Sequence, residues 1–279
     1  MSRQNEEIVT VIRPISRWEV LNFRQIFSFH DLILALGIRD IKLRYRQTAL
    51  GVIWVVLQPL VASLIFGFVF NVVAGLKAPN GLPYFLFSYA GMLGWNAFSA
   101  TLTKAAGSLV QNSALVSKVY FPKIIVPASS VFSTIVDFAV GFVVLLVMLP
   151  IFGVGISWPI LLAPVWLLLV AMGALGLGFY ASALMVSYRD IQYILPVMVN
   201  FLLYASPVPY ALNMVPKQFQ WAIAANPLTG VLEGMRWSLL GTTPPATGTL
   251  IYSVVSILGA FILGALLFGR AERRFADVI

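Results

Sequence analysis

Few residues of this chain have the type and spacing that carry chemistry, and the most informative of them is Asp137. It lies near the centre of a long apolar stretch, Ile124–Leu149, where an ionisable group is costly and usually faces the interior of a helical bundle. Such a carboxylate is either an ion or proton site, or a structural group bonded to Ser133 or Thr134 one turn back or to another helix. Because one isolated carboxylate makes a poor proton relay, we expect the structural role.

The residues that hydrolysis or tight metal binding would require are missing from the sequence. It contains no cysteine and a single histidine, His30, which excludes a thiolate metal site, a histidine cluster and a catalytic triad. It also lacks the G-x-x-x-x-G-K-[ST] loop, so the chain encodes no P-loop ATP-binding fold. We therefore expect no catalytic residue, no metal ligand and no cofactor in this chain.

The composition is typical of a protein surrounded by lipid. Of the 279 residues, 60% are hydrophobic and 10% are charged, whereas a soluble domain has about 25% charged residues. A soluble chain of this size has too little interior to hide so much apolar surface, so lipid is the solvent that suits it. The first 30 residues are polar and contain no apolar core of the signal-peptide type, so we expect the N-terminus to be retained.

Six apolar stretches approach the roughly 20 residues that a membrane-spanning helix needs. We therefore predict an all-α integral membrane fold with six transmembrane helices. The fifth stretch contains Pro196, Pro207 and Pro209, which a span tolerates where neighbouring helices satisfy the freed carbonyls. The predicted spans are Gly51–Ala74, Tyr84–Leu102, Ile124–Leu149, Pro159–Val186, Ile191–Leu212 and Thr249–Phe268.

The Lys and Arg residues divide unevenly between the two sides of these spans. Of the 18 basic residues, only Lys77, Lys217 and Arg236 fall in connections of one side. Since basic residues are retained in the cytoplasm, an even number of spans puts both termini there. The predicted segments are a cytoplasmic N-terminal region at 1–49, a six-span domain at 50–270 and a short cytoplasmic tail at 271–279.

Residues 28–47 have the pattern of an amphipathic helix that lies in the membrane interface. Leu34 and Ile38 belong to an apolar face at helical spacing, and basic residues follow another face. Such a helix buries its apolar side at the headgroup boundary and holds its cations against anionic lipid. It is either a simple anchor or also a contact for a cytoplasmic partner. Its basic residues are Arg39, Lys42, Arg44 and Arg46.

The connection between the second and third predicted spans is too apolar for a solvated loop. Asn112 or Ser113 is a suitable cap for a short helix that ends before Pro122. We expect this segment to contact a cytoplasmic partner. Its apolar residues are Leu115, Val116, Val119, Tyr120 and Phe121.

The segment 213–248 on the outer side predicts two short helices, one over 217–224 and one that begins at Asn226-Pro227. Asparagine caps the second helix, proline takes its first position and Gly241 ends it. At about 14 residues it is too short to span. Glu233 and Arg236 lie three residues apart on one face of this helix and can pair. The hairpin is either a lid over an exit, which we favour, or a helical pair resting on the membrane surface.

Small residues and aromatic residues each recur at helical spacing within the spans. Small residues let helices approach closely, and they occur at Ala174, Gly178 and Ser182 and again at Ser256, Ala260 and Gly264. Aromatic rings stack on the C–H faces of sugars, so an aromatic lane with few charges would suit a moving glycan; packing and lipid contact are the alternatives. The expected lane residues are Phe66, Phe70, Tyr193, Asn200 and Tyr204.

The chain resembles the membrane subunits of ABC polysaccharide exporters, the permeases for O-antigen, capsule and teichoic acid. Four stretches carry this resemblance, in the expected order over nearly the whole chain: RDIKLRYRQTALGVIWVVLQPL (Arg39–Leu60), SKVYFPKIIVP (Ser117–Pro127), YRDI (Tyr188–Ile191) and ANPLTGVLEGMR (Ala225–Arg236). The resemblance implies a channel-forming permease in the bacterial inner membrane that moves a lipid-linked polysaccharide outward. None of the four stretches identifies the glycan.

The resemblance also implies partners and roles for individual residues. The chain would form a homodimer with two copies of a separate ATPase, which would carry ATP and Mg²⁺; no nucleic acid is involved. Coupling to the ATPase would involve Asn112, Leu115, Lys118, Tyr120, Phe121, Arg189 and Asp190, and the outer gate would involve Asn226, Pro227, Glu233 and Arg236. The alternatives are a permease of the same architecture for a drug or small lipid, and a membrane scaffold without transport.

Overall fold

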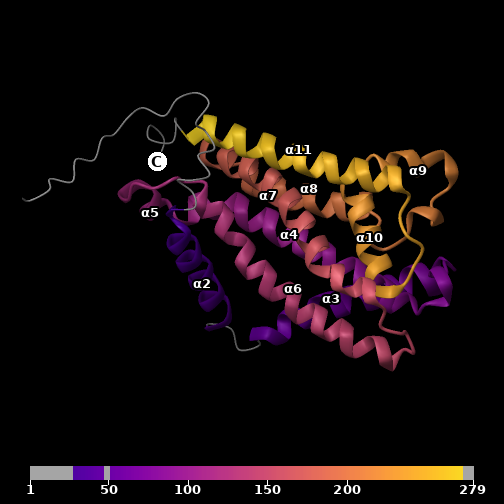
Figure 1. The fold of residues 1–279 in the computed structure, drawn as a ribbon. Helices are drawn as coiled ribbons and strands as arrows, with labels where there is room; N and C mark the ends of the chain where they lie inside the picture. Colours follow the sequence, from indigo (N-terminus) through magenta and orange to yellow (C-terminus); the bar gives the residue numbers. More distant parts are fainter. Residues whose placement is uncertain (1–27, 47–50, 273–279) are drawn as a thin grey trace, which may run out of the picture.

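A computed structural model describes residues 28–46 and 51–272 of the chain. Every regular element in these ranges is helical, which confirms the predicted class (Figure 1). The helices are α2 (His30–Arg46), α3 (Gly51–Phe66) with a π-helical continuation (Gly67–Val73), α4 (Tyr84–Gln111), α5 (Ser113–Lys118), α6 (Ile125–Ile151), α7 (Ala163–Ser187), α8 (Ile191–Ala205), α9 (Lys217–Ala224), α10 (Leu228–Leu240) and α11 (Thr247–Glu272). Most of the predicted segment 1–49 and of the tail 271–279 lies outside the described residues.

Four helices in the described ranges are long and apolar enough to cross a membrane. They correspond to the first, third, fourth and sixth predicted spans, whose existence as long apolar helices and whose approximate ends are confirmed. They run over Ile53–Val73, Ile125–Ile151, Trp158–Ser187 and Thr247–Glu272. A shorter apolar helix, α8, corresponds to the predicted fifth span.

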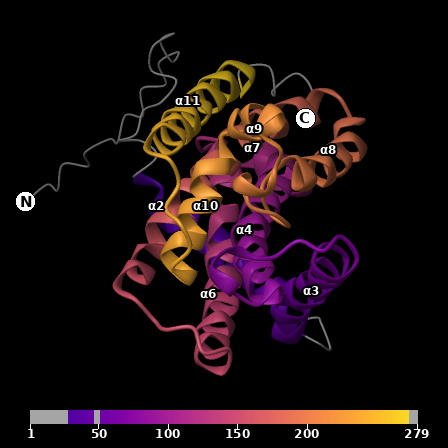
Figure 2. The same cartoon turned by 90° about the vertical axis from the view of Figure 1, so that its right-hand side faces the viewer.

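The second predicted span is a long helix that is less apolar than the four candidate spans. α4 continues to Gln111, beyond the predicted end at Leu102, and at 28 residues it is long enough to cross a bilayer. It lies among the other helices in the end-on view (Figure 2) and packs against α3, α6, α7 and α10. Most of its residues are buried by protein, so α4 can carry polar side chains that a lipid-facing helix would exclude.

The predicted fifth span, Ile191–Leu212, is wrong in length. α8 ends at Ala205 after 15 residues, a rise of about 22 Å against a hydrocarbon core of about 30 Å. Proline disfavours helical backbone in the residue before it, and Ser206, which precedes Pro207, is extended with φ −106° and ψ 149°. The chain then turns without helix through Tyr210.

Small residues bring α7 and α11 into close contact. On α11 these are the predicted Ala260 and Gly264, whereas on α7 the contact residue is Gly176, which the four-residue spacing did not include. A Cβ on Gly264 of α11 would meet the backbone of Gly176 in α7, and a Cβ on Gly176 would meet the backbone of Ala260. Gly178, expected in such a contact, faces α4 instead, where a Cβ on Gly178 would lie 2.7 Å from the Cβ of Ala105. The glycines of α7 therefore serve two different helix contacts.

The amphipathic helix α2 packs on the first half of α6 (Figure 1). Leu36 is buried, and Gly37 lies directly under the ring of Phe132, where a Cβ would come within 2.7 Å of the ring. Leu34 and Ile38 remain exposed. α2 therefore has a protein-facing side and an exposed apolar edge suited to lipid.

Candidate functional site

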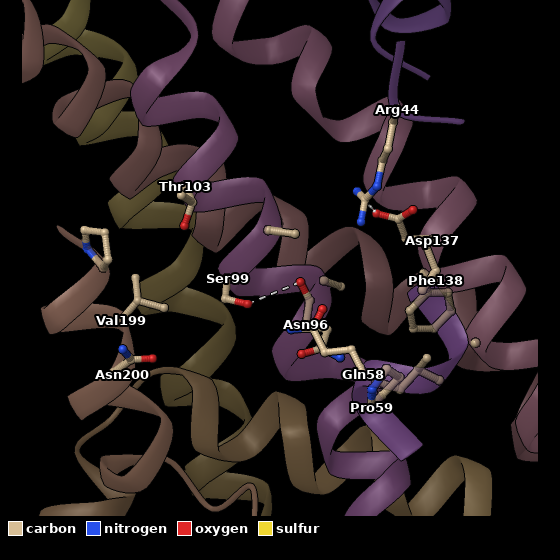
Figure 3. Close-up of a pocket in the computed structure, with 16 residues that line it drawn as sticks. Arg44, Gln58, Pro59, Asn96, Ser99, Thr103, Asp137, Phe138, Val199 and Asn200 are labelled. Atoms are coloured by element: carbon tan, nitrogen blue, oxygen red, sulfur yellow. Dashed lines mark hydrogen bonds and ion pairs between the residues drawn. The ribbon is translucent and has the colours of Figure 1, made fainter. Parts of the chain in front are cut away.

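A cavity with many polar lining residues lies between α3, α4, α6 and α8. It has a volume of about 330 Å³, and α4 forms its floor with α3 and α8 on either side (Figure 3). Its polar lining residues are Arg44, Gln58, Asn96, Ser99, Thr103, Asp137 and Asn200, and its apolar lining includes Val55, Leu93, Phe138 and Val199.

The lining of this first cavity combines uncharged polar groups with an apolar surface. Side-chain amides come from Gln58 on α3, Asn96 on α4 and Asn200 on α8. Hydroxyls come from Ser99 and Thr103, one helical turn apart on α4. Amides and hydroxyls both donate and accept hydrogen bonds, so this part of the lining can bind an uncharged polar molecule, while the ion pair of Arg44 and Asp137 belongs to the same lining.

The residues predicted for the aromatic lane are divided by the structure. Asn200 lines the first cavity, whereas Phe66 is buried in the core and Phe70 stacks on Tyr84 with ring centroids 6.5 Å apart. Tyr193 and Tyr204 are exposed on α8 and belong to neither the core nor the cavity lining. Phe66 and Phe70 are therefore packing residues within this chain. Helical spacing alone did not distinguish these two residues from the exposed residues of α8.

Asp137 is bonded to two cations from other helices, which spacing along the chain did not predict. Arg44 of α2 forms an ion pair with its Oδ2 atom, and Lys104 Nζ of α4 lies 3.5 Å from the same atom. The Asp137 side chain is 14% exposed. In Figure 3 the guanidinium of Arg44 extends towards the carboxylate above Phe138. The structural role expected for Asp137 therefore takes the form of an inter-helical charge cluster.

Ser133 and Thr134, the expected partners of Asp137, receive hydrogen bonds from other helices. Ser133 Oγ accepts one from Lys104 Nζ at 2.7 Å, and Thr134 Oγ1 accepts one from Thr101 Oγ1 at 3.0 Å. One turn of α6 thus provides three adjacent polar contacts to α2 and α4. Sequence spacing finds neighbours within a helix but not a partner 93 positions away, as for Arg44 and Asp137.

A second cavity, of about 590 Å³, lies between α2, α4 and α6 on the other side of this charge cluster. Arg44 lines both cavities, Asp137 lines the first, and Lys104 lines the second. The other polar residues that line the second cavity are Arg39, Asp40, Ser108, Gln111, Asn112, Ser130 and Ser133.

The interfacial pattern predicted that the basic residues of α2 face away from the protein. In the structure only some of them do. Arg39 Nη2 donates hydrogen bonds to Asp40 Oδ1 and to Asn112 Oδ1, each at 2.8 Å. Arg44 forms an ion pair with Asp137. Lys42 and Arg46 are exposed. Only these last two remain in the position suited to headgroup contact.

The predicted short helix in the second-to-third connection is present as α5, with Asn112 at its start. Asn112 Nδ2 donates to Ser108 O at 2.8 Å, which fixes the turn from α4. Tyr120 is 76% exposed, whereas Phe121 is 5% exposed and packs in a core cluster with Val116. The apolar pattern therefore contains both a surface residue and an interior one.

The remaining residues predicted for coupling lie at the same end of the bundle. Lys118 is exposed at the end of α5, and Leu115 packs partly against the core cluster. Arg189 and Asp190 are exposed in the turn between α7 and α8. This turn is adjacent to α4, because Ala106 packs with Met185. α5 and this turn thus present side chains at the end of α4 where Gln111 lies.

At the opposite end, Arg236 of α10 is 2% exposed and holds the non-helical segment that follows α8. Its guanidinium donates to the backbone carbonyls of Val208 and Tyr210, the latter at 3.1 Å, and lies 4.1 Å from the ring centroid of Phe87. Burial lowers the pKa of Arg236 to about 10, with Glu233 opposing that shift, so the group remains cationic at neutral pH.

The predicted ion pair between Glu233 and Arg236 does not form between these two described residues. Glu233 Oε1 accepts a hydrogen bond from the backbone N–H of Leu212 at 2.8 Å. Burying a backbone group without a hydrogen-bond partner costs more free energy than an exposed ion pair between residues i and i+3 contributes. Both side chains therefore bond the irregular backbone beside them.

The predicted end of α10 is confirmed, and its start lies one residue later than predicted. Asn226 Oδ1 accepts the backbone N–H of Leu228 at 3.0 Å, but Leu228 is the first helical residue and Pro227 takes the N-cap position before it. Gly241 ends the helix in the left-handed conformation with φ 64°. Asn226 Nδ2 also donates to Ser206 Oγ at 2.8 Å, so this residue links α10 to the end of α8.

No cluster of His, Asp and Glu residues that could hold a metal ion occurs within 28–46 and 51–272. Tyr84, the first residue of the second predicted span, donates a hydrogen bond from its hydroxyl to Pro209 O at 2.7 Å. Lys104, Gln58, Asn96 and Tyr84 carry no sequence signal that marks them as site residues, since only their tertiary neighbours distinguish them.

Known proteins match this chain over most of its length. The O-antigen export system permease protein RfbA of Klebsiella pneumoniae is 29% identical over 261 residues, which cover 89% of this chain and 95% of the relative. RfbA of Myxococcus xanthus is 27% identical over 259 residues (92% and 98%), and the polysialic acid transport protein KpsM of Escherichia coli is 25% identical over 244 residues (85% and 92%). The family described as ABC-2 type transporter matches residues 31–240, so the chain belongs to this family of membrane transport proteins, from the first turn of α2 to the end of α10.

Proposed function

We propose that this chain is the permease subunit of an ATP-driven exporter that moves a lipid-linked polysaccharide across the bacterial inner membrane. The observation that carries the proposal is the first cavity: a half-open groove with amide and hydroxyl groups, in a chain whose relatives are O-antigen and polysialic acid permeases. ATP and Mg²⁺ belong to a separate ATPase subunit, in keeping with the missing P-loop.

The groove forms one wall of the proposed passage, and a second copy of the chain supplies the opposite wall. Apolar side chains are exposed along α3 with its π-helical continuation and along α8, on both sides of the groove, among them Trp54, Phe68 and Phe201. Tyr193 and Tyr204 are exposed on α8 as well. A homodimer packed through these helices brings two grooves face to face, and sugar rings then contact aromatic and amide groups from both copies.

The membrane topology in this proposal has six crossings. α4 crosses as the protein-surrounded central helix, and α8 crosses together with the extended segment that Arg236 and Tyr84 satisfy. Both termini are then cytoplasmic, with α5 and the Arg189-Asp190 turn on the cytoplasmic face. α9 and α10 lie at the outer end, where Asn226, Pro227, Glu233 and Arg236 fix the gate helices.

Tyr120 and Lys118 are the proposed contacts for the ATPase, since Lys118 is exposed at the end of α5 and Tyr120 is exposed just after it. Leu115 and Asn112 support α5 from behind, and Phe121 anchors the connection in the core. The basic residues Lys42 and Arg46 face the inner leaflet and attract the anionic group of the lipid-linked cargo.

A complementation experiment tests the proposed function. A strain that lacks this gene should lose surface polysaccharide and accumulate lipid-linked glycan on the cytoplasmic side. The wild-type chain should restore export, and Asn96→Trp should not, because the indole fills the groove without altering the α5 surface. The matched control is Leu161→Trp, at a residue exposed outside the groove. Normal glycan export by the deletion strain would refute the proposal.

A further inference from the structure

We propose that the Arg44–Asp137 ion pair closes the inner end of the substrate cavity, and that Lys104 neutralises Asp137 when Arg44 withdraws. The three residues then act as a switch that allows α2 to move without leaving an unpaired charge in the bundle. This inference depends on the proposed function, since it makes α2 an element that the ATPase displaces.

The position of the charge cluster carries the first step. The first cavity, between α3, α4, α6 and α8, and the second cavity, between α2, α4 and α6, share only Arg44 and Ala100 in their linings. Ala100 has only a methyl group, so Arg44 is the longer of the two side chains that border both spaces. Withdrawal of its guanidinium would join a 330 Å³ cavity to a 590 Å³ cavity.

The chemistry of Asp137 carries the second step. An ionised carboxylate that is 14% exposed is costly to leave without a partner. Arg44 and Lys104 both approach its Oδ2 atom, so one carboxylate oxygen serves two cations. One cation is sufficient to neutralise the carboxylate, and the two cations repel each other, which reduces the cost of removing one of them.

The anchoring of the two cations shows which of them moves. Lys104 lies within the long central helix α4 and is also bonded to Ser133 Oγ at 2.7 Å. Arg44 lies two residues from the end of α2, a helix that packs mainly on α6. α2 is linked through Arg39 to Asn112, the residue between α4 and α5. A force on α5 therefore reaches α2, while Lys104 stays beside Asp137.

Accessibility of a cysteine in the first cavity tests this switch. The chain has no cysteine, so Asn96→Cys introduces a single thiol. The assembled transporter with its ATPase is placed in vesicles, and a membrane-impermeant maleimide is applied from each side, with and without ATP. In the otherwise unchanged chain we expect slow labelling from the α5 side without ATP and faster labelling with ATP.

Variants of the three charged residues should separate in this assay. Asp137→Asn and Arg44→Gln each remove the closing pair, so labelling without ATP should rise about tenfold, the scale on which loss of a partly buried interaction shifts a two-state equilibrium. Lys104→Met keeps the pair, so resting labelling should stay slow and the ATP-driven increase should be lost. Lys104→Arg should restore that increase.

A purely structural charge cluster predicts a different result. All three neutral variants would then reduce assembly together, without opposite effects on labelling. Unchanged resting labelling in Asp137→Asn and Arg44→Gln, or equal behaviour of Lys104→Met and Asp137→Asn, would overturn the inference. Ser130→Ala, which removes a hydroxyl from the second cavity and leaves the charges in place, is the control. Thiol labelling does not depend on the cargo, so a failure here is distinguishable from a failure of glycan export.

Discussion

The guanidinium of Arg39 donates a hydrogen bond to the side-chain oxygen of Asn112, 73 positions further along the chain, at 2.8 Å. This bond connects α2 to the junction of α4 and α5. The two elements proposed to receive force from the ATPase are therefore in direct contact, and a displacement of one is transmitted to the other.

Asn112→Leu is expected to impair coupling more than stability. The substitution removes the acceptor for Arg39 and the donor to Ser108 O, in a junction that water can reach, so the loss of folding free energy should be about 1 kcal/mol. ATP hydrolysis should continue while glycan exported per ATP falls. Parallel assays of ATPase rate and export in proteoliposomes measure this; a proportional fall in both would contradict it.

Tyr120→Asp and Phe121→Asp should have different consequences, although the residues are adjacent. Tyr120 is exposed, so Tyr120→Asp should change the unfolding free energy by less than about 0.5 kcal/mol and weaken copurification of the ATPase. Phe121 is buried in a cluster that contains Val116 and Ile125, so Phe121→Asp should destabilise the subunit by more than about 3 kcal/mol. Thermal unfolding in detergent and pull-down of the ATPase separate the two effects.

Arg236→Met is expected to disorder the segment after α8. It leaves the carbonyls of Val208 and Tyr210 without their donor, at a cost of about 1–3 kcal/mol for each buried group. Arg236→Lys should recover only part of this loss, because a lysine cannot serve two diverging acceptors as the planar guanidinium does. Protease sensitivity of residues 206–212 in both variants is the measurement, with Lys217→Met as an exposed control.

Gly264→Val should prevent correct packing of α11 on α7. A Cβ at this position would overlap the carbonyl of Gly176, and backbone cannot move aside as a side chain can, so the subunit should be recovered in low yield or as aggregate. Gly259→Val on the same helix meets no atom within 4 Å and is the matched control. Comparable yields of the two variants, measured by size-exclusion chromatography, would argue against the contact.

Tyr204→Ala and Phe66→Ala should differ in how they affect export. Tyr204 is exposed on α8, so its loss should slow glycan export while leaving subunit stability unchanged within about 0.5 kcal/mol. Phe66 packs against Phe70 with ring centroids 6.0 Å apart, so Phe66→Ala should leave a cavity and cost about 3–5 kcal/mol. Export per folded subunit, measured for both variants, distinguishes a role in the passage from a role in packing.

The class of the protein, four apolar spans and the local features of the short helices could all be predicted from the sequence. Length, apolarity and capping depend on residues within one turn or one segment, so Asn226, Pro227 and Gly241 specified α10 before any tertiary contact was known. The same local features predicted α9 at 217–224 and the short helix α5 with its start at Asn112 or Ser113. The predicted length of α8 was too great, because a span tolerates proline only where neighbouring helices satisfy the freed carbonyls, and the sequence pattern does not show those neighbours.

Which polar and aromatic residues meet could be seen only in the packed bundle. Helical periodicity put Phe66 with the lane residues and Phe121 with Tyr120, yet burial separates both pairings. It placed Asp137 at a costly depth but did not reveal its partners. Electrostatic and hydrogen-bond partners are selected by distance in space, and the bundle brings α2, α4 and α6 together from positions far apart in sequence. The charge cluster at Asp137 is therefore a product of helix packing, whereas the sequence alone indicated only that one carboxylate within an apolar helix requires some polar partner.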